Sequence, residues 1–456
     1  MNVDERIIQM NTLPVVVVGA GPIGLAAAAQ LRERGLTPLV FERGPVAGAA
    51  ISEWNHVRLF SRWGELIDPA ARRLLDATGW VAPDDEAYPT GQDWTRDYLS
   101  PLAAALGDIV QLGTEVVGVA RRGRDRVVDA GRDTEPLSVH LRRADGTADR
   151  ILAQAVIDAS GTWTTPNPLG GEGLPALGEK SAADRIEYRV PNIDDPEVRA
   201  RYAGKHIVIA GSGHSALTAI VALADLEKQA PGTRISWVLR RGDAGSTFGG
   251  GEDDQLPARG ALGLRAKAAV DDGLLQVVPG FRTAAIESHG ERVVLVSDTG
   301  ARIEDVDRVV VLTGFRPDLS WLSEIRLGLD PVLQAPVELA PLIDPNVHSC
   351  GTVYPHGVAE LSHPEPNVFL VGMKSYGRAP TFLAMTGYEQ VRSIAAALAG
   401  DHDAAARVEL TLPETGVCGG AGVFDDPDTP AAAEESVGCC VAPDPQLITL
   451  SARAGG

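Results

Sequence analysis

The sequence predicts an α/β protein with two Rossmann-like dinucleotide-binding domains and a flexible C-terminal tail. Two glycine-rich turns, within residues 14–24 and 206–216, are the main observation. Each turn follows a run of β-branched residues and opens a helix. A single turn of this kind is weak evidence, but here both copies carry the strand and the helix around them. Two such units in one chain indicate two bound dinucleotides.

The first turn has the glycine spacing that a pyrophosphate needs. Gly19 and Gly21 allow a tight turn and close backbone approach, and Gly24 lets the following helix, residues 25–34, pack on the strand. The helix N-terminus adds partial positive charge. The first dinucleotide is therefore expected at Gly19, Gly21, Pro22 and Gly24.

The second strand, within residues 37–41, ends in a carboxylate. Glu42 stands about 20 residues beyond the turn, where it can hold a ribose diol, and Arg43 follows it. This arrangement suits the adenosine half of FAD or NAD, with both side chains beside the cofactor.

The second unit differs at the corresponding position. After a helix over residues 216–228, the strand 235–239 ends in Arg240 and Arg241, with no carboxylate. Guanidinium groups pair well with a 2′-phosphate, so this unit is expected to prefer NADPH to NADH. The alternative is a pair of solvated surface arginines. The turn itself is expected to bind phosphate through Gly211, Ser212, Gly213, His214 and Ser215.

These features resemble the flavoproteins with two dinucleotide-binding domains, both the flavin-containing monooxygenase-like and the pyridine nucleotide-disulfide reductase-like branches. Two further segments match that group, 155–162 with Gly161 and 309–318 with Gly314. The resemblance covers about residues 10–400. It implies an FAD-binding domain at 10–190 and 305–400, with an NADP-binding domain inserted at 195–300.

The same resemblance suggests further flavin contacts. Trp54 and Arg58 follow the second strand, where such proteins place residues beside the flavin, although both are equally compatible with core packing. The strand containing Val117 is expected to meet adenine through its backbone.

A third matching segment lies near residue 370. The strand 367–372 leads into a helix whose first residues, Pro380, Thr381 and Phe382, are expected near the pyrimidine end of the flavin. The reductase branch usually has Gly-Asp at the end of this strand, whereas Met373 and Lys374 stand here. The departure weakens a strict reductase assignment.

Two segments depart from expected patterns. The monooxygenase-like fingerprint keeps Gly178 but has residues 181–184 where a histidine is expected. Residues 249–254 contain three acidic groups without the alternating spacing of a calcium loop, so we expect a solvated turn near the NADP site.

Cysteine placement narrows the chemistry. Cys350 is the only cysteine in residues 1–400, so a flavin-proximal redox pair of the thioredoxin or glutathione reductase kind is absent from that part. The tail, residues 401–456, is rich in Gly, Ala and Pro and carries Cys418, Cys439 and Cys440. Thiolates bind soft metals, which suggests a metalloid site. Tolerated free thiols and a thiol relay are the alternatives.

The tail also resembles two kinds of flavoprotein. Mercuric reductases carry an adjacent cysteine pair near the C-terminus, and flavin-dependent proteins found among bacterial arsenic-resistance functions can end in cysteine-rich tails. The adjacent Cys439 and Cys440 carry the first likeness, and the segments 373–381 and 412–418 carry the second.

Composition fits two or three globular domains in a chain of 456 residues. The net charge of −20 disfavours nucleic acid and anionic membrane as partners. No targeting or membrane-spanning segment is visible, so a cytoplasmic protein is expected. No interface signal indicates an oligomeric state.

Together these features predict an FAD- and NADPH-dependent oxidoreductase, monooxygenase-like, with a small molecule or a metalloid as substrate, oxygen as a candidate acceptor and a link to arsenic detoxification. One alternative is a flavin reductase that passes electrons to the tail thiols or to a metalloid. Another is a redox-sensing or metalloid-sequestering flavoprotein.

Overall fold

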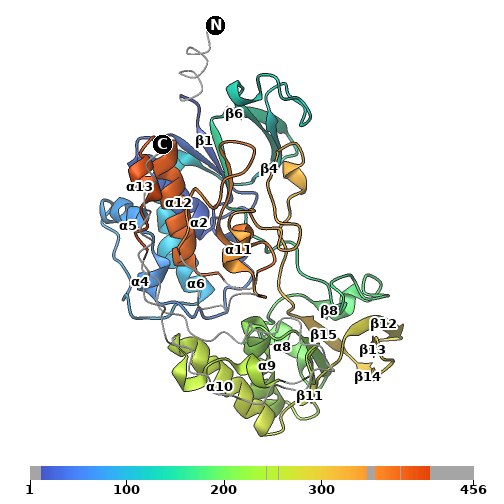
Figure 1. Cartoon of the computed structure of the whole chain (residues 1–456). Coiled ribbons are helices and arrows are strands. Elements are labelled where there is room, and N and C mark those ends of the chain that lie inside the picture. The colour runs from blue at the N-terminus through green and yellow to red at the C-terminus, as the bar shows by residue number, and fades with distance from the viewer. Residues whose placement is uncertain (1–11, 243, 255, 347–354, 380–381, 411–456) are drawn as a thin grey trace, which may run out of the picture.

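The computed structural model describes residues 12–242, 244–254, 256–346, 355–379 and 382–410. They form two lobes, one above the other in Figure 1. The first lobe combines both ends of the described chain, and the second is made from its middle. This confirms the predicted α/β class with two parallel-sheet, Rossmann-like units.

The first lobe is built on a five-stranded parallel sheet in the order β16-β7-β1-β2-β3. Its central strand is a run of four valines, and alternate side chains enter two separate cores. Burial on both faces explains why the run is continuously apolar. The strands are β1 (Val15–Val18), β2 (Pro38–Phe41), β3 (Val110–Gln111), β7 (Ala155–Asp158) and β16 (Val368–Leu370).

Helices cover one face of this sheet. α2 (Pro22–Glu33) is rich in alanine, which lets α12 (Ala384–Leu398) pack closely beside it. α5 (Pro69–Asp76) and α7 (Ser100–Leu106) complete this core. The shorter helices of the lobe are α3 (Ala49–Ser52), α4 (Trp63–Leu66), α6 (Gly91–Trp94), α11 (Ala340–Ile343) and α13 (His402–Ala406).

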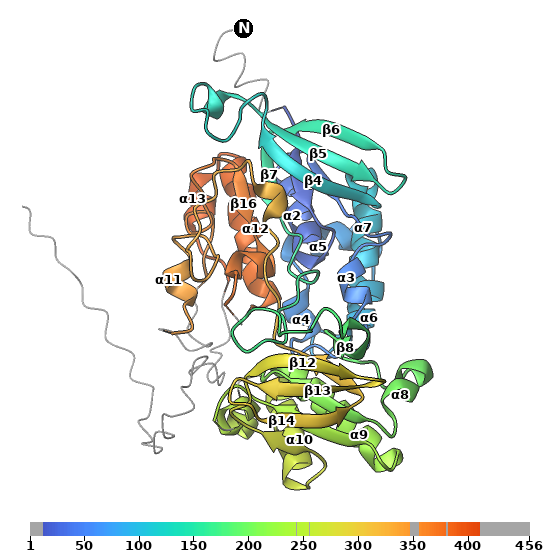
Figure 2. The same ribbon diagram turned by 90° about the vertical axis from the view of Figure 1, so that its right-hand side faces the viewer.

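An antiparallel three-stranded sheet covers the opposite face. It consists of β4 (Thr114–Arg121), β5 (Leu137–Arg143) and β6 (Ala148–Ala153). Figure 2 shows it at the far end of the first lobe, away from the second. Its apolar side chains share a core with the outer-facing residues of β1, so the lobe has three layers.

The second lobe repeats the plan with a parallel sheet in the order β11-β10-β9-β15-β8. Helices lie on one face and a second antiparallel sheet on the other. The strands of the parallel sheet are β8 (Ile186–Glu187), β9 (His206–Ala210), β10 (Arg234–Val238), β11 (Gln276–Val278) and β15 (Arg308–Val311). The remaining elements are α8 (Pro196–Tyr202), α9 (His214–Gln229), α10 (Pro257–Asp271), β12 (Thr283–His289), β13 (Arg292–Ser297) and β14 (Arg302–Val306).

The lobe boundaries differ from those expected. The sequence pattern places residues up to 190 and from 305 in the first domain, but in the second sheet β15 pairs with β8 on one side and with β9 on the other. The second sheet therefore spans residues 186–311. The sequence pattern gave no sign of this because β8 is only two residues long.

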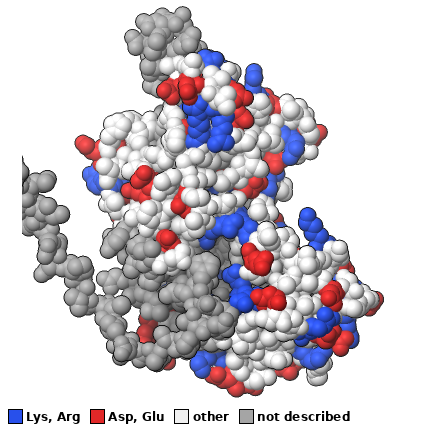
Figure 3. Space-filling model, turned by 45° about the vertical axis from the view of Figure 1, so that its right-hand side comes forward, with Lys and Arg blue, Asp and Glu red and all other residues white. Residues whose placement is uncertain are grey.

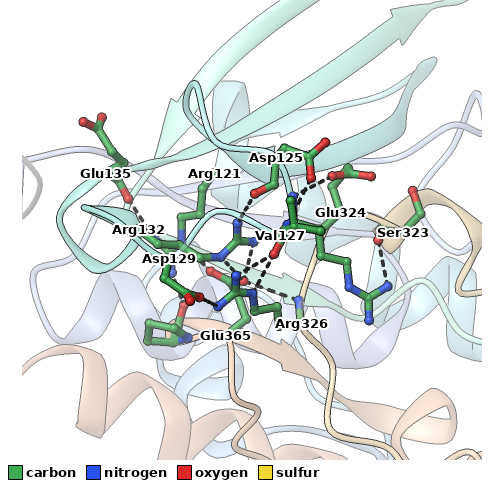
Figure 4. Close-up of polar contacts among 12 residues, drawn as sticks. Arg121, Asp125, Val127, Asp129, Arg132, Glu135, Ser323, Glu324, Arg326 and Glu365 are labelled. Carbon is green, nitrogen blue, oxygen red and sulfur yellow. Dashed lines mark hydrogen bonds and ion pairs between the residues drawn. The ribbon is translucent and has the colours of Figure 1, made fainter.

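A buried ionic cluster anchors the chain that returns to the first lobe (Figure 4). The Glu365 carboxylate accepts hydrogen bonds from Arg121 Nε at 2.6 Å and Arg132 Nη2 at 2.7 Å. Burial would raise the pKa of Glu365, but the two guanidinium groups outweigh it and lower that pKa. The cluster ties the β4–β5 connection to the segment that leads into β16.

Among the described residues, no helix is long and apolar enough to cross a membrane.

Candidate functional site

The first glycine turn leaves an open surface at the carboxyl end of β1. A Cβ on Gly24 would lie 1.9 Å from the Gly19 carbonyl oxygen, so close helix packing requires glycine there. Gly19 has φ of 98°, a conformation that favours glycine. Gly21 differs, because a Cβ there would meet nothing within 4 Å. With Pro22 beginning α2, this open position at a helix N-terminus fits a phosphate group.

Glu42 lies where a ribose beside this turn would be held. Its Oε2 accepts a hydrogen bond from the Ala20 amide at 2.9 Å, and its Oε1 accepts one from the Gly44 amide at 2.7 Å. These bonds fix the carboxylate against the turn, and a carboxylate has further lone pairs for a diol. Arg43 beside it is exposed.

Val117 lies at an irregularity of β4. The pairing with β5 shifts between Val116 and Gly118, so Val117 has no partner in the ladder. Its side chain is exposed. This placement is compatible with the predicted backbone contact to adenine.

Trp54 and Arg58 lie in the connection after α3. The half-buried Trp54 ring packs so closely on Gly91 that a Cβ there would lie 2.9 Å from it. The exposed Arg58 donates a hydrogen bond to the Tyr88 carbonyl. Within the described residues Trp54 thus has a packing role.

The second glycine turn repeats the geometry of the first at the end of β9. Gly211 has φ of 131°, and a Cβ there would lie 2.2 Å from the Leu312 carbonyl oxygen. The indole of Trp237 donates to the Gly211 carbonyl at 2.8 Å. A Cβ on Gly213 would meet nothing within 4 Å, so this turn is also open at the start of α9. Ser212 is half-buried and Ser215 exposed beside it.

His214 is the residue of this turn that contacts the first lobe. Its ring meets Phe60 edge to face, with ring centroids 5.2 Å apart. Burial lowers the pKa of His214 to about 4, the charge of Arg259 acts in the same direction, and Asp254 opposes them. Without a bound dinucleotide, His214 is therefore neutral at pH 7.

The acidic segment 249–254 is only partly the solvated turn expected. Glu252 and Asp253 are exposed, but Asp254 is buried and pairs with Arg259 Nη2 at 2.7 Å. The expectation was wrong for Asp254 because the arginine that neutralises it lies on α10, where no motif marks it. Within the described residues, no group of three His, Cys, Asp or Glu side chains is arranged to hold a metal.

Arg240 and Arg241 follow directly after β10. Arg240 is exposed, and its Nη1 lies 3.4 Å from the Gly171 carbonyl. Although the residue is exposed as a whole, nearby protein atoms partly desolvate the guanidinium, and this effect and then the charge of Arg241 lower the pKa of Arg240. Figure 3 shows Lys and Arg side chains gathered at the waist between the lobes. An anionic group would relieve the repulsion between Arg240 and Arg241.

Sequence reasoning missed the role of Lys374. Its Nζ lies 2.7 Å from Asp158 Oδ2 and 3.0 Å from Ser160 Oγ, and both charged side chains are buried. It also lies 5.1 Å from the centre of the Trp321 ring. The only signal was Asp158 itself, a charged residue in an apolar parallel strand. Lys374 thus supports the strand end before Gly161, whose φ is 68°.

Some expected site residues are less well placed. Phe382 is half-buried and meets Tyr376 edge to face at 5.1 Å, just before α12. Met373 is exposed. Gly314 has φ of 91° at the end of β15. Outside the described residues lie Pro380, Thr381, Cys350, Cys418, Cys439 and Cys440.

Comparisons with curated proteins point to redox enzymes. The chain is 24% identical over 326 residues to a ferredoxin--NADP reductase of Ignicoccus hospitalis, covering 69% of this chain and 81% of the relative. It is 29% identical over 204 residues to the indole-3-pyruvate monooxygenase YUCCA1 of rice (Oryza sativa subsp. japonica), covering 44% of this chain and 43% of that protein.

Solved structures share the fold. Bacillithiol disulfide reductase from Bacillus cereus matches 85% of this chain and 99% of its own, with a TM-score of 0.62 and 19% identity. A flavin-containing monooxygenase from Stenotrophomonas maltophilia matches 85% of this chain and 98% of its own, with a TM-score of 0.52 and 21% identity.

A family model describes most of the chain. The model of the pyridine nucleotide-disulphide oxidoreductases matches residues 13–354, which include both glycine turns and both open positions. This family and the relatives imply the use of FAD and NADP(H), in agreement with the two cofactors predicted from the sequence. The chain belongs to the pyridine nucleotide-disulphide oxidoreductase family.

Proposed function

We propose that this protein is an NADPH-dependent, FAD-containing oxidoreductase of the monooxygenase type. The observation that carries the proposal is the pair of open glycine turns, at Gly21 and Gly213, each at the carboxyl end of its own parallel sheet. The polar side chains at the next strand end differ, Glu42 in one lobe and Arg240 with Arg241 in the other. This difference favours FAD in the first lobe and NADPH in the second.

The protein groups would bind and orient the cofactors. The amides around Gly21 and the start of α2 would hold the FAD pyrophosphate, while Glu42 would accept hydrogen bonds from the ribose. The amides around Gly213 would hold the second pyrophosphate, and Arg240 and Arg241 would pair with the 2′-phosphate. FAD supplies the capacity to take two electrons from the nicotinamide and pass them to an acceptor.

Two observations favour oxygen with a small-molecule substrate as the acceptor. The chain resembles an indole-3-pyruvate monooxygenase in sequence and a flavin-containing monooxygenase in fold. In addition, the sequence has no cysteine pair in residues 1–400 that could shuttle electrons to a disulfide. The alternative is a reductase without oxygen insertion, which the relation to a ferredoxin--NADP reductase favours.

Anaerobic reduction separates the two functions. The purified protein with bound FAD would be reduced by NADPH without oxygen, and its absorbance followed after oxygen or a one-electron acceptor is added. We expect fast reduction by NADPH and slow reduction by NADH. In a monooxygenase, the reduced flavin should react with oxygen through a transient absorbance that precedes the return of the oxidised flavin spectrum. Direct return of that spectrum, with rapid transfer to the one-electron acceptor, would favour the reductase. Failure of NADPH to reduce the flavin would overturn both.

The link to metalloids rests on the sequence alone. None of the relatives described above is named for arsenic, and Cys418, Cys439 and Cys440 lie outside the described residues. As a hypothesis, these thiols bind arsenite and deliver it to the flavin site. Calorimetric titration with arsenite should then show binding that disappears when all three are changed to serine. Unchanged affinity would exclude them as the binding site.

A further inference from the structure

Asn167 joins the two stretches of chain that connect the lobes. One stretch leaves β7 and passes Gly161, and the other leaves β15 and passes Gly314. The Asn167 amide N–H donates to the Gly314 carbonyl at 2.9 Å, and its side-chain Nδ2 donates to the Thr313 carbonyl at 2.8 Å. The Thr313 hydroxyl returns a hydrogen bond to the Asn167 carbonyl at 3.2 Å.

Arg316 adds further hydrogen bonds between the same two stretches, and we call this whole set of bonds the clasp. Its Nε donates to Asn167 Oδ1 at 2.5 Å, and its backbone N–H donates to the Thr165 carbonyl at 2.8 Å. Its Nη2 reaches the Gly173 carbonyl at 2.7 Å. Pro166 and Phe315 form an isolated antiparallel bridge at the same place. Both hydrogen-bonding atoms of the Asn167 side chain, Oδ1 and Nδ2, thus bond to the opposite stretch. We call the two paired stretches the hinge.

Two contacts lie away from the clasp and join the same lobes. Glu53, after α3, forms an ion pair with Arg189, after β8, at 2.7 Å. The Arg189 guanidinium also lies 5.1 Å from the centre of the Trp163 ring. The second contact is the Phe60 and His214 ring pair described above. Contacts at separate points restrict rotation about the connecting strands as well as bending.

We propose that Asn167 is a positioning residue for hydride transfer, which holds the two lobes in one fixed relative orientation. The inference rests on the proposed function, because orientation matters when each lobe carries one of the reacting cofactors. Reacting atoms must come within about 3–3.5 Å, and a misplacement of about 1 Å can slow a reaction about 100-fold. A rotation at the clasp changes the distance between groups held by different lobes, so the hydrogen bonds of Asn167 help to set the distance between the reacting atoms.

The test measures the distance between the lobes directly. Cys350, Cys418, Cys439 and Cys440 would be changed to serine, and nitroxide labels attached at Arg150→Cys and Lys228→Cys, two exposed positions in different lobes. Pulsed electron resonance should give one narrow distance distribution, unchanged by NADP⁺. Asn167→Ala should broaden it. A broad distribution in the parent protein, or a narrow one in Asn167→Ala, would overturn the proposal whatever the enzyme's activity.

Kinetics then separate positioning from simple loss of structure. Asn167→Ala should lower the limiting rate of flavin reduction about 10- to 100-fold, with the NADPH concentration for half-saturation nearly unchanged. Thr313→Val, which replaces a hydroxyl with a methyl group, should give a smaller change of the same kind and keeps the test valid if the first variant misfolds. Asn346→Ala, at an exposed position outside the hinge, is the matched control. Equal losses in rate and affinity for the two hinge variants would contradict a positioning role.

Because the distance measurement needs neither turnover nor NADPH, the two proposals fail separately. A rigid hinge in a protein that NADPH does not reduce would leave the clasp intact and refute the function. A reducible flavin with a loose hinge would do the reverse.

Discussion

Lys374 and Asp158 form a buried ion pair, with 2.7 Å between Nζ and Oδ2, that joins the end of β7 to the turn after β16 in the first lobe. Removing one partner of such a pair leaves an uncompensated buried charge. Lys374→Met should therefore lower the free energy of unfolding by about 3 kcal/mol or more. Urea unfolding followed by tryptophan fluorescence measures the change.

Two further variants show whether pairing is the cause. The double variant Lys374→Met with Asp158→Asn should recover part of the loss, because no isolated charge remains. Lys228→Met, at an exposed lysine of α9, should change stability by less than about 0.5 kcal/mol. Strict additivity of the two single substitutions would show that the charges do not interact.

Glu42 is expected to retain FAD. Because its carboxylate is fixed against the first turn by the amides of Ala20 and Gly44, Glu42→Ala should lose both the ribose contact and the support of the turn. The variant should be purified with much less bound FAD, measured from the ratio of flavin to protein absorbance. Glu291→Ala, at an exposed position of the second lobe, should keep its FAD. Full occupancy in Glu42→Ala would refute the assignment.

Arg240 and Arg241 are expected to select NADPH. Changing both to alanine should raise the KM for NADPH about 10-fold or more, because two charge-assisted hydrogen bonds to the 2′-phosphate are lost. The KM for NADH should hardly change. Arg234→Ala, at the opposite end of the same strand, should affect neither cofactor. Equal weakening for both cofactors would mean that the arginines do not contact the 2′-phosphate.

Asp68 makes stability depend on pH. Burial raises the pKa of this carboxyl to about 6, although hydrogen bonds from Ala71 and Gln30 oppose the change. The folded state therefore binds this proton more tightly than the unfolded state. The resulting stabilisation is complete below about pH 3.8 and is lost as the pH rises through about 6.

The Asp68→Asn variant isolates this effect. As the pH rises from 5.5 to 7.5, the free energy of unfolding of the parent protein should fall by about 1 kcal/mol more than that of the variant. Asp76→Asn, at an exposed position on α5, the helix that Asp68 caps, should follow the parent. Parallel pH profiles for parent and Asp68→Asn would show that Asp68 does not titrate in this range.

The sequence predicted the local units well. The helix expected at 25–34 is α2 (Pro22–Glu33), and the strand expected at 235–239 is β10 (Arg234–Val238), because hydrophobic periodicity and glycine spacing are local signals. Lys374 with Asp158 and Asn167 with Arg316 could not be predicted. Each pair joins segments that are far apart in the sequence, and no local pattern records which polar groups meet after folding.

The cluster around Glu365 bears on how the chain folds during synthesis. Arg121 and Arg132 are made early, whereas Glu365, β16 and α12 emerge only after the entire second lobe. When the second lobe leaves the ribosome, its own sheet is complete. The first lobe then still lacks β16, α12 and the carboxylate of Glu365 that pairs with the two arginines. Since domains fold as units during translation, the second lobe should fold first, and the incomplete first lobe should be the part of the nascent chain that chaperones protect.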